Sequence, residues 1–339
     1  MPVIKLFELV SKLSKAERRA FKLSASYKKD QSLLYLLFDH ICSLKEENYH
    51  LLTTKIKNER LLKKLPRIKR DLYSKLLDFL ASYHEDKLIN AKIYKQIRIA
   101  TILIEKQLYK QAWEQIIKAK KQAQLYERYN FILDALVVQT RIINKTESPK
   151  NKIVKRDAFN LEINEALAQL QWIFKQDQLV AKLWTNYNSN GATKEPQQFE
   201  IYQKELDELP PLRFKGYRFR KQYELIRSLY FNLLGDAENS YLCKKRLVEI
   251  SNQYPHFTKI YIEEHIIALL NLIFSGIRNK VFQETLIHLE ELELFLKSCS
   301  SSLQGFVLSE DRLDLGLKGL LKLAAYSVSL HRSRVGGAY

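Results

Sequence analysis

The sequence contains little glycine or proline, with 9 glycines and 7 prolines among 339 residues. A many-stranded sandwich or barrel uses these residues in its turns, so the shortage argues against both and favours long helices. The glycine-containing patterns G-x-x-x-x-G-K-S/T, G-x-G-x-x-G and G-x-S-x-G do not occur. Phosphate-cradling loops and the strained nucleophile turn therefore have no support in the sequence.

Cysteine is also scarce, and Cys42, Cys243 and Cys299 stand far apart with no C-x-x-C pair. This spacing supports neither a disulfide framework nor a cysteine-based zinc site, and it fits a reducing cytosol. The 7 histidines form no H-E-x-x-H motif and no i, i+4 pair. The cluster His84-Glu85-Asp86 is typical of a solvated helix end. We therefore expect no metal, no cofactor and no enzymatic activity.

Long apolar runs are missing as well. The beginning of the chain, MPVIKLFELVSKLSK, returns to charged residues before it reaches the length of a signal-peptide core. The longest apolar stretch, Ile266–Ile277, is interrupted by Asn271 and Ser275. We predict neither an export signal nor a membrane span, and we expect a cytoplasmic protein.

What the sequence does contain is apolar surface and positive charge. Hydrophobic residues make up 46% and charged residues 28%, which is enough to bury a core and excludes global disorder. The net charge of +18 comes from 56 basic and 38 acidic residues. Residues 1–150 hold 31 basic and 16 acidic side chains, a balance of +15, so the remainder carries only +3. A surface of this kind attracts phosphates or acidic proteins to the front of the chain.

Capping residues and helical periodicity organise the first part of the chain. Ser14 and Glu17 form a capping box that predicts a short helix, and Asp30 is the expected N-cap of a helix over residues 31–44. A single apolar stripe at helical spacing follows, in which Pro66 either kinks the helix or begins a new one. The stripe consists of Leu61, Leu65, Ile68, Leu72, Leu76, Phe79 and Leu80.

From Ala91 onward the pattern becomes helix, turn, helix. The spacing Y-x-x-A-x-x-x-I-x-x-A from Tyr109 resembles the second helix of a tetratricopeptide repeat, and weaker echoes begin at Ala237, after Gly235-Asp236, and at Phe282. The echoes are unevenly spaced, so the repeats are degenerate. Polar stretches predict loops at residues 144–152, 186–198, 206–212 and 298–305.

Over residues 14–120 the order of these segments resembles a group of uncharacterised bacterial helical proteins with a tetratricopeptide-like body. The segments that carry the resemblance run from SKLSKAERRAFKLSAS through NERLLKKLPRIKRDLYSKLLDFLASYH to EKQLYKQAWEQIIKAKKQA. The resemblance implies a cytosolic helical-repeat scaffold and brings no catalytic residues.

We therefore predict an all-α protein. Residues 1–86 are expected to form a basic N-terminal helical module. Residues 87–298 are expected to form an α-solenoid of degenerate tetratricopeptide-like helix pairs, stacked antiparallel with a right-handed sense. Residues 299–339 are expected to form a C-terminal helix and a poorly patterned tail.

Two basic patches are candidate contacts for an acidic partner or for phosphate. The first lies opposite the apolar stripe, a pattern that an ordinary solvated helix face also produces. The second interleaves cations with aromatic residues, as single-strand binders do, but the spacing of Phe219, Tyr223, Ile226 and Tyr230 favours packing for at least two of the aromatics. The candidate residues are Arg60, Lys63, Lys64, Arg67, Lys69 and Arg70 in the first patch and Arg213, Lys215, Arg218 and Arg220 in the second.

The leading functional hypothesis is a non-enzymatic protein–protein interaction scaffold that binds a peptide or an acidic protein segment in a helical-repeat groove. Its 19 tyrosines offer large contact areas at low rotamer cost. The alternative is nucleic-acid binding by the N-terminal module, in which helices around Leu51–Glu59 and Pro66–Tyr83 would form a helix-turn-helix-like unit without a glycine in its turn.

Overall fold

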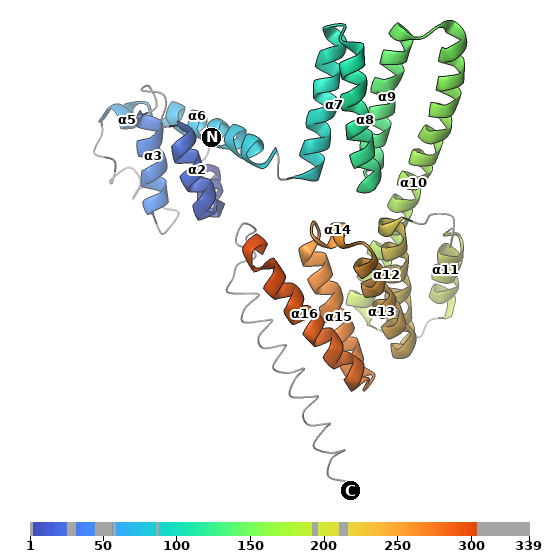
Figure 1. Cartoon of the computed structure of the whole chain (residues 1–339). Helices are drawn as coiled ribbons and strands as arrows, with labels where there is room; N and C mark the ends of the chain where they lie inside the picture. The colour runs from blue at the N-terminus through green and yellow to red at the C-terminus, as the bar shows by residue number, and fades with distance from the viewer. Residues whose placement is uncertain are drawn as a thin grey trace. The chain divides into compact units, whose positions relative to one another are not determined.

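The computed structural model describes residues 3–25, 32–44, 56, 59–85, 88–191, 196–209 and 216–303. These residues are helical and contain no strand, which confirms the all-α prediction (Figure 1). The early helices are α1 (Val3–Lys12), α2 (Lys15–Ala25), α3 (Ser32–Ser43), α5 (Glu59–Lys63), α6 (Leu65–Glu85) and α7 (Ile89–Glu105). The later ones are α8 (Tyr109–Leu125), α9 (Tyr129–Thr146), α10 (Pro149–Asn190), α11 (Pro196–Asp207), α12 (Tyr217–Leu234), α13 (Ala237–Gln253), α14 (Pro255–Thr258), α15 (Ile262–Arg278) and α16 (Phe282–Leu303).

The helices belong to two compact units. Among the described residues, those up to Lys95 fall in the first unit and Gln96–Ser301 in the second, so the border lies within α7. The predicted division at residues 86 and 298 stays a prediction. Within the described ranges, no helix is both long and apolar enough to cross a bilayer.

The first unit packs α1, α2, α3 and α6 around a core with Phe21 and Phe38 at its centre, their ring centroids 4.9 Å apart. The apolar stripe contributes to this core as predicted, because its members from Leu61 to Leu76 are all buried. The stripe is divided between two helices, since α5 ends before Lys64 and α6 begins at Leu65. Pro66 therefore occupies a first turn, where its missing N–H costs no helical hydrogen bond.

The predicted capping box at the start of α2 is present. The Ser14 N–H donates to Glu17 Oε2 at 2.7 Å, and the Glu17 N–H donates to Ser14 Oγ at 3.2 Å. The other carboxylate oxygen of Glu17 lies 2.7 Å from His84 Nε2 on α6. The interpretation of His84 as part of a solvated helix end is thus wrong, because its ring ties α6 to the start of α2. The predicted N-cap at Asp30 lies outside the described residues.

In the second unit, four helix pairs are joined by turns of two or three residues that share one backbone pattern. The middle or first residue of each turn is left-handed, with φ between 51° and 73°, and these residues are Gln107, Glu127, Gly235 and Lys280. The N–H of the next residue donates to the carbonyl five positions earlier, at 2.8–2.9 Å, which is the Schellman arrangement. The pairs that the turns connect are α7 with α8, α8 with α9, α12 with α13 and α15 with α16.

The repeat pattern and its two echoes predicted from the sequence begin directly after three of these turns. Tyr109, Ala237 and Phe282 are each the first residue of the helix that follows a turn. The turn between α8 and α9 was not predicted, because Glu127 occupies the left-handed position where glycine is the usual signal.

A buried residue lies five positions after the left-handed residue of each turn. The four buried residues are Ala112, Ile132, Ser240 and Thr285. At two of these places the paired helices approach closely. Ser240 Oγ lies 3.3 Å from Ser228 Oγ, and a Cβ at Gly276 would collide with the Thr285 hydroxyl. Small residues at these places let the two helices of a pair pack closely.

Helix α10 spans 42 residues and packs against both α9 and α12. It corrects two loop predictions, because only Glu147 and Ser148 separate it from α9 and it continues through residue 190. Pro149 at its first turn favours helix rather than loop, and the polar residues from Asn186 that suggested a second loop form the last turns of the helix. The loop predicted from residue 298 is also wrong, since α16 continues to Leu303.

Candidate functional site

Helices α10, α12, α13 and α15 line a hollow in the second unit. It consists of two cavities of about 290 and 440 Å³ that share wall residues from α12, α13 and α15. We call the two adjoining cavities together the groove. The shared wall residues are Leu225, Leu247, Ala268 and Asn271.

Apolar side chains line much of the groove and several remain accessible to solvent. Trp184 in the first cavity is 54% exposed, Phe274 is 41% exposed, and Ile267 in the second cavity is 56% exposed. Side chains of this size normally become buried when a partner is available. The groove therefore offers apolar area that the described residues of the chain do not cover.

The second cavity is lined by charges of both signs. Lys221 Nζ lies 2.6 Å from Glu264 Oε2, across α12 and α15. Gln222 Nε2 donates to Asp177 Oδ1 at 3.0 Å, and burial raises the pKa of Asp177 above its usual value. Arg218 lines the same cavity. This end of the groove therefore holds two basic and two acidic side chains, Arg218 and Lys221 with Asp177 and Glu264.

The first cavity differs because its two cations are not compensated. Lys244 Nζ contacts Ser275 Oγ at 3.3 Å, and within the described ranges neither Lys244 nor Arg278 forms an ion pair with a carboxylate. Burial lowers the pKa of Lys244, and the neighbouring charge of Arg278 lowers it further. This end of the groove therefore keeps a local excess of positive charge.

A carboxylate distant in sequence caps the first turn of α12, a helix that lines both cavities of the groove. Glu127 Oε1 accepts the N–H of Tyr217 at 2.5 Å, and Oε2 accepts that of Arg218 at 2.9 Å, so the turn before α9 caps the start of α12. A Cβ at Gly216 would come within 2.8 Å of the same carboxylate. Glycine at this position is what allows the carboxylate to approach, and the cap fixes where α12 begins.

Aromatic rings pack around the same contact between the turn before α9 and the start of α12. Tyr217 stacks on Phe257 of α14 with ring centroids 4.2 Å apart and an interplanar angle of 14°. Tyr126, next to Glu127, meets the edge of Phe257 at 6.1 Å. Helix α14 thus packs against both the start of α12 and the turn before α9.

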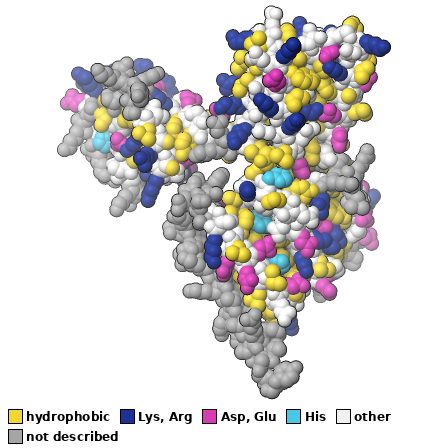
Figure 2. Space-filling model, in the orientation of Figure 1, with side chains coloured by type: hydrophobic (Ala, Val, Ile, Leu, Met, Phe, Trp, Pro, Cys, Tyr) yellow, Lys and Arg dark blue, Asp and Glu magenta, His cyan; other side chains and the backbone are white. Residues whose placement is uncertain are grey.

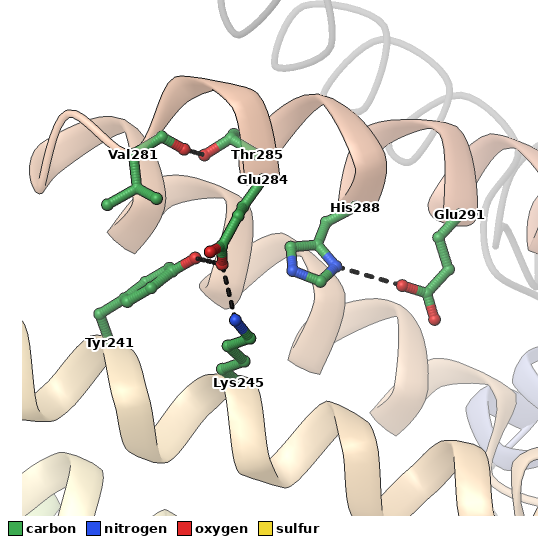
Figure 3. Close-up of polar contacts among 7 residues, drawn as sticks. All are labelled: Tyr241, Lys245, Val281, Glu284, Thr285, His288 and Glu291. Atoms are coloured by element: carbon green, nitrogen blue, oxygen red, sulfur yellow. Dashed lines mark hydrogen bonds and ion pairs between the residues drawn. The ribbon is translucent and has the colours of Figure 1, made fainter.

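A polar cluster lies between α13 and α16 (Figure 3). Glu284 Oε2 accepts from Lys245 Nζ at 2.8 Å and from Tyr241 Oη at 2.9 Å, and these hydrogen bonds hold the pKa of Glu284 below its usual value. His288 Nδ1 points instead toward Glu291, at 3.2 Å. The Glu284 contacts join α13 to α16, whereas the His288–Glu291 contact lies within α16. Neither described cavity of the groove is lined by this cluster.

The first predicted basic patch is largely exposed on α5 and α6. Arg67 and Arg70 both face Asp71, at 3.6 and 3.8 Å, so part of their charge is neutralised. Lys69 differs from the prediction because it is buried, with 8% of its surface exposed, and burial lowers its pKa. The exposed members are Arg60, Lys63, Lys64, Arg67 and Arg70.

The second predicted patch is divided. Arg213 and Lys215 lie outside the described residues, Arg218 lines the groove, and Arg220 donates to Gln253 Oε1 at 3.1 Å. The packing interpretation of its aromatics is confirmed, since Phe219 and Tyr230 are buried.

Sequence reasoning missed the residues that distinguish the groove, above all Lys244, Asn271 and Arg278. No motif contains them, because they come from α13 and α15 and meet only after these helices pack. Figure 2 shows why charge alone is a poor guide, since Lys and Arg side chains are spread over α7–α9 and intermixed with acidic ones over α12–α16.

The predicted helix-turn-helix-like unit is only partly within the described residues. Most of its first helix falls outside them, and α5 is separated from α6 by Lys64 alone. Arg67 and Arg70 do lie near the start of α6, as expected.

Comparison of the chain with protein-family models, with curated proteins and with solved structures finds no match.

Proposed function

We propose that this protein is a non-enzymatic interaction scaffold that binds a peptide segment of a partner protein in the groove. The observation that supports the proposal most strongly is the pair of adjoining cavities along α10, α12, α13 and α15, which share four wall residues and leave Trp184, Ile267 and Phe274 exposed. Large apolar side chains in a concave surface are the usual anchors for a peptide.

The proposal includes the repeat architecture. The recurring turn, with a small or apolar residue buried five positions after it, supports a body of degenerate tetratricopeptide-like helix pairs that stack into a solenoid. Such stacking produces a concave surface lined by alternate helices. The cytosolic location implied by the resemblance of residues 14–120 belongs to the same proposal.

Asn271 has a position suited to an extended peptide. Its side chain is exposed, lies in the wall that both cavities share, and makes no side-chain hydrogen bond within the described part of the chain. An amide side chain supplies both a donor and an acceptor to a passing peptide backbone. We expect Asn271 to bond the backbone of the bound segment.

The proposal is tested by selecting binders from a displayed library of random peptides. The selected peptides are then measured against Ile267→Asp and Phe274→Asp, which place a charge in the groove on already exposed positions. Ile287→Asp on α16 is the matched control, because it is 63% exposed and outside the groove. We expect the groove variants to weaken binding at least tenfold and the control to leave it unchanged. Failure to select any peptide, or equal binding by all three variants, would refute the proposal.

A second candidate function is phosphate-backbone binding by the first unit, which is favoured by the exposed cations on α5 and the start of α6. Binding through about five phosphate contacts weakens steeply with salt. The variant Arg67→Ala with Arg70→Ala should flatten the logarithmic salt slope for a DNA duplex by up to about two units. Asp71 already neutralises part of their charge, so a smaller change is expected than for two free arginines. Equal binding of a duplex and a neutral polymer at low salt would exclude this function.

A further inference from the structure

We propose that Lys244 and Arg278 form the charged subsite of the groove and that this subsite binds a side-chain carboxylate of the peptide, beside one of its large apolar residues. This inference rests on the proposed peptide-binding function and names the chemistry that anchors the peptide.

The first observation is the contrast between Lys244 and its neighbours. Lys221, which lines the second cavity, and Lys182 and Lys245, which lie outside the groove, each place Nζ within 2.6–2.8 Å of a carboxylate oxygen, so these lysines of α10, α12 and α13 are paired with the protein's own acids. Lys244 is half-buried and contacts only the Ser275 hydroxyl among the described residues. A cation taken partly out of water without an anion loses hydration that nothing repays.

The second observation is that another cation lies at the same cavity. Arg278, at the end of α15, lines the first cavity together with Lys244 of α13 and the Ser275 that Lys244 contacts. Its charge disfavours protonation of Lys244. A bound anion would relieve both the repulsion and the desolvation, so the cavity is electrostatically complementary to negative charge.

The surroundings indicate which anion fits. Apolar and aromatic side chains line most of the rest of this cavity, including Trp184, Leu229 and Phe274. A guanidinium fork binds the two oxygens of a carboxylate side by side, and an ammonium group adds a further donor. One carboxylate therefore matches the donors present, and the aromatic wall matches an apolar residue next to it. An aspartate or glutamate neighbouring a large apolar residue supplies both.

The test uses two displayed libraries of random 12-residue peptides, which are about 40 Å long when extended. One library contains Asp and Glu, and in the other these are replaced by Asn and Gln. We expect binders from the acidic library to lose at least tenfold in affinity when their anchoring acid is changed to its amide. The same loss is expected with Arg278→Gln and with Lys244→Gln, whereas Lys244→Arg keeps most of the affinity.

Arg141→Gln and Lys259→Gln serve as controls, because both residues are exposed and outside the groove. Arg278 is itself exposed, so loss of binding in Arg278→Gln is not expected to reflect misfolding. Binders of equal affinity from the amide library would overturn the carboxylate subsite and leave the groove proposal intact. Absence of binders from both libraries would overturn the proposed function and this inference with it. Tighter binding of a peptide whose anchoring acid is replaced by phosphoserine would assign the subsite to phosphate and overturn the carboxylate assignment.

Discussion

Two half-buried glutamates cap helix starts in this protein, and their pKa values move in opposite directions. Burial alone would raise the pKa of Glu17, but hydrogen bonds from Ser14 and from His84 lower it below its usual value of 4.5. Burial raises the pKa of Glu127, and the N–H groups of Arg218 and Tyr217 and the charges of Arg218 and His256 only partly offset it. The two caps should therefore respond to pH with opposite signs.

Glu17→Gln removes a cap whose ionised form is favoured by folding. We expect a loss of about 1 kcal/mol of stability in the first unit at neutral pH. The stabilisation from Glu17 is present above the usual carboxyl pKa and is lost as the pH falls through the lowered folded value, so the difference from the parent protein should vanish in acid. Hydrogen exchange of α2 and α6 measures it. A difference that persists unchanged at pH 3 would contradict the assignment.

Glu127→Gln tests the opposite sign. A carboxyl with a raised folded pKa stabilises the fold below its unfolded pKa, and this stabilisation is lost as the pH rises through the folded value. The stability of the parent protein relative to Glu127→Gln should therefore fall as the pH rises above about 4.5. Urea unfolding followed by tryptophan fluorescence reports it, because Trp113, Trp172 and Trp184 all lie in the second unit. A relative stability that rises with pH would show that the two N–H donors outweigh burial.

The two caps also show what a sequence reveals at this scale. Ser14 and Glu17 are three residues apart and form a local pattern, so the box was predictable. Glu127 and Tyr217 are separated by 90 positions, and nothing in either segment indicates the other. His84 was misjudged for the same reason, since its partner lies 67 positions earlier.

At the scale of elements, the recurring turns carry a conformational cost in three of four cases. Gln107, Glu127 and Lys280 adopt a left-handed backbone that only glycine adopts without penalty. Helices were predictable because apolar periodicity is local, and Gly235-Asp236 marked one turn. The other turns lack glycine, so only the apolar periodicity located their helices. The exact ends of these helices are set by packing.

Replacing Gln107 or Lys280 by glycine should stabilise the second unit by about 0.5–1 kcal/mol each, because the left-handed strain is removed from exposed positions. Gly235→Ala should cost about 1 kcal/mol or more, since its φ is 73° and alanine is strained there. The control is Lys106→Gly, next to Gln107, which gains only chain flexibility and should destabilise. Chemical unfolding midpoints measure all four variants, and stabilisation by Lys106→Gly equal to that of Gln107→Gly would contradict the strain argument.

At the scale of the whole molecule, the described cores are separate. One surrounds Phe21, Leu72 and their neighbours in the first unit, and others surround Leu229 and Leu272 in the second. The all-α class was predictable from composition and periodicity. The groove was not, because its residues come from four helices whose contacts are set by tertiary packing rather than by any local pattern.

Separate cores predict separate losses of stability. Leu72→Ala and Leu272→Ala each remove a side chain with no exposed surface and should cost about 2–5 kcal/mol in their own unit. Hydrogen exchange monitored by mass spectrometry should accelerate in α6 and α3 for the first variant and in α13 and α15 for the second. Equal acceleration in both units by either variant would show that they unfold as one.

In all four turns the next helix begins two positions after the left-handed residue, and this constant spacing sets a limit on insertions and deletions in this chain. One added residue in a turn rotates the following helix by about 100° relative to its partner. The side chain placed at the close approach would then be Gln111 instead of Ala112, Asn239 instead of Ser240, or Glu284 instead of Thr285. Each exchange presents a larger polar group to a helix that has room for a small one. Lineages of this protein should therefore vary in the residues of these turns while keeping their length.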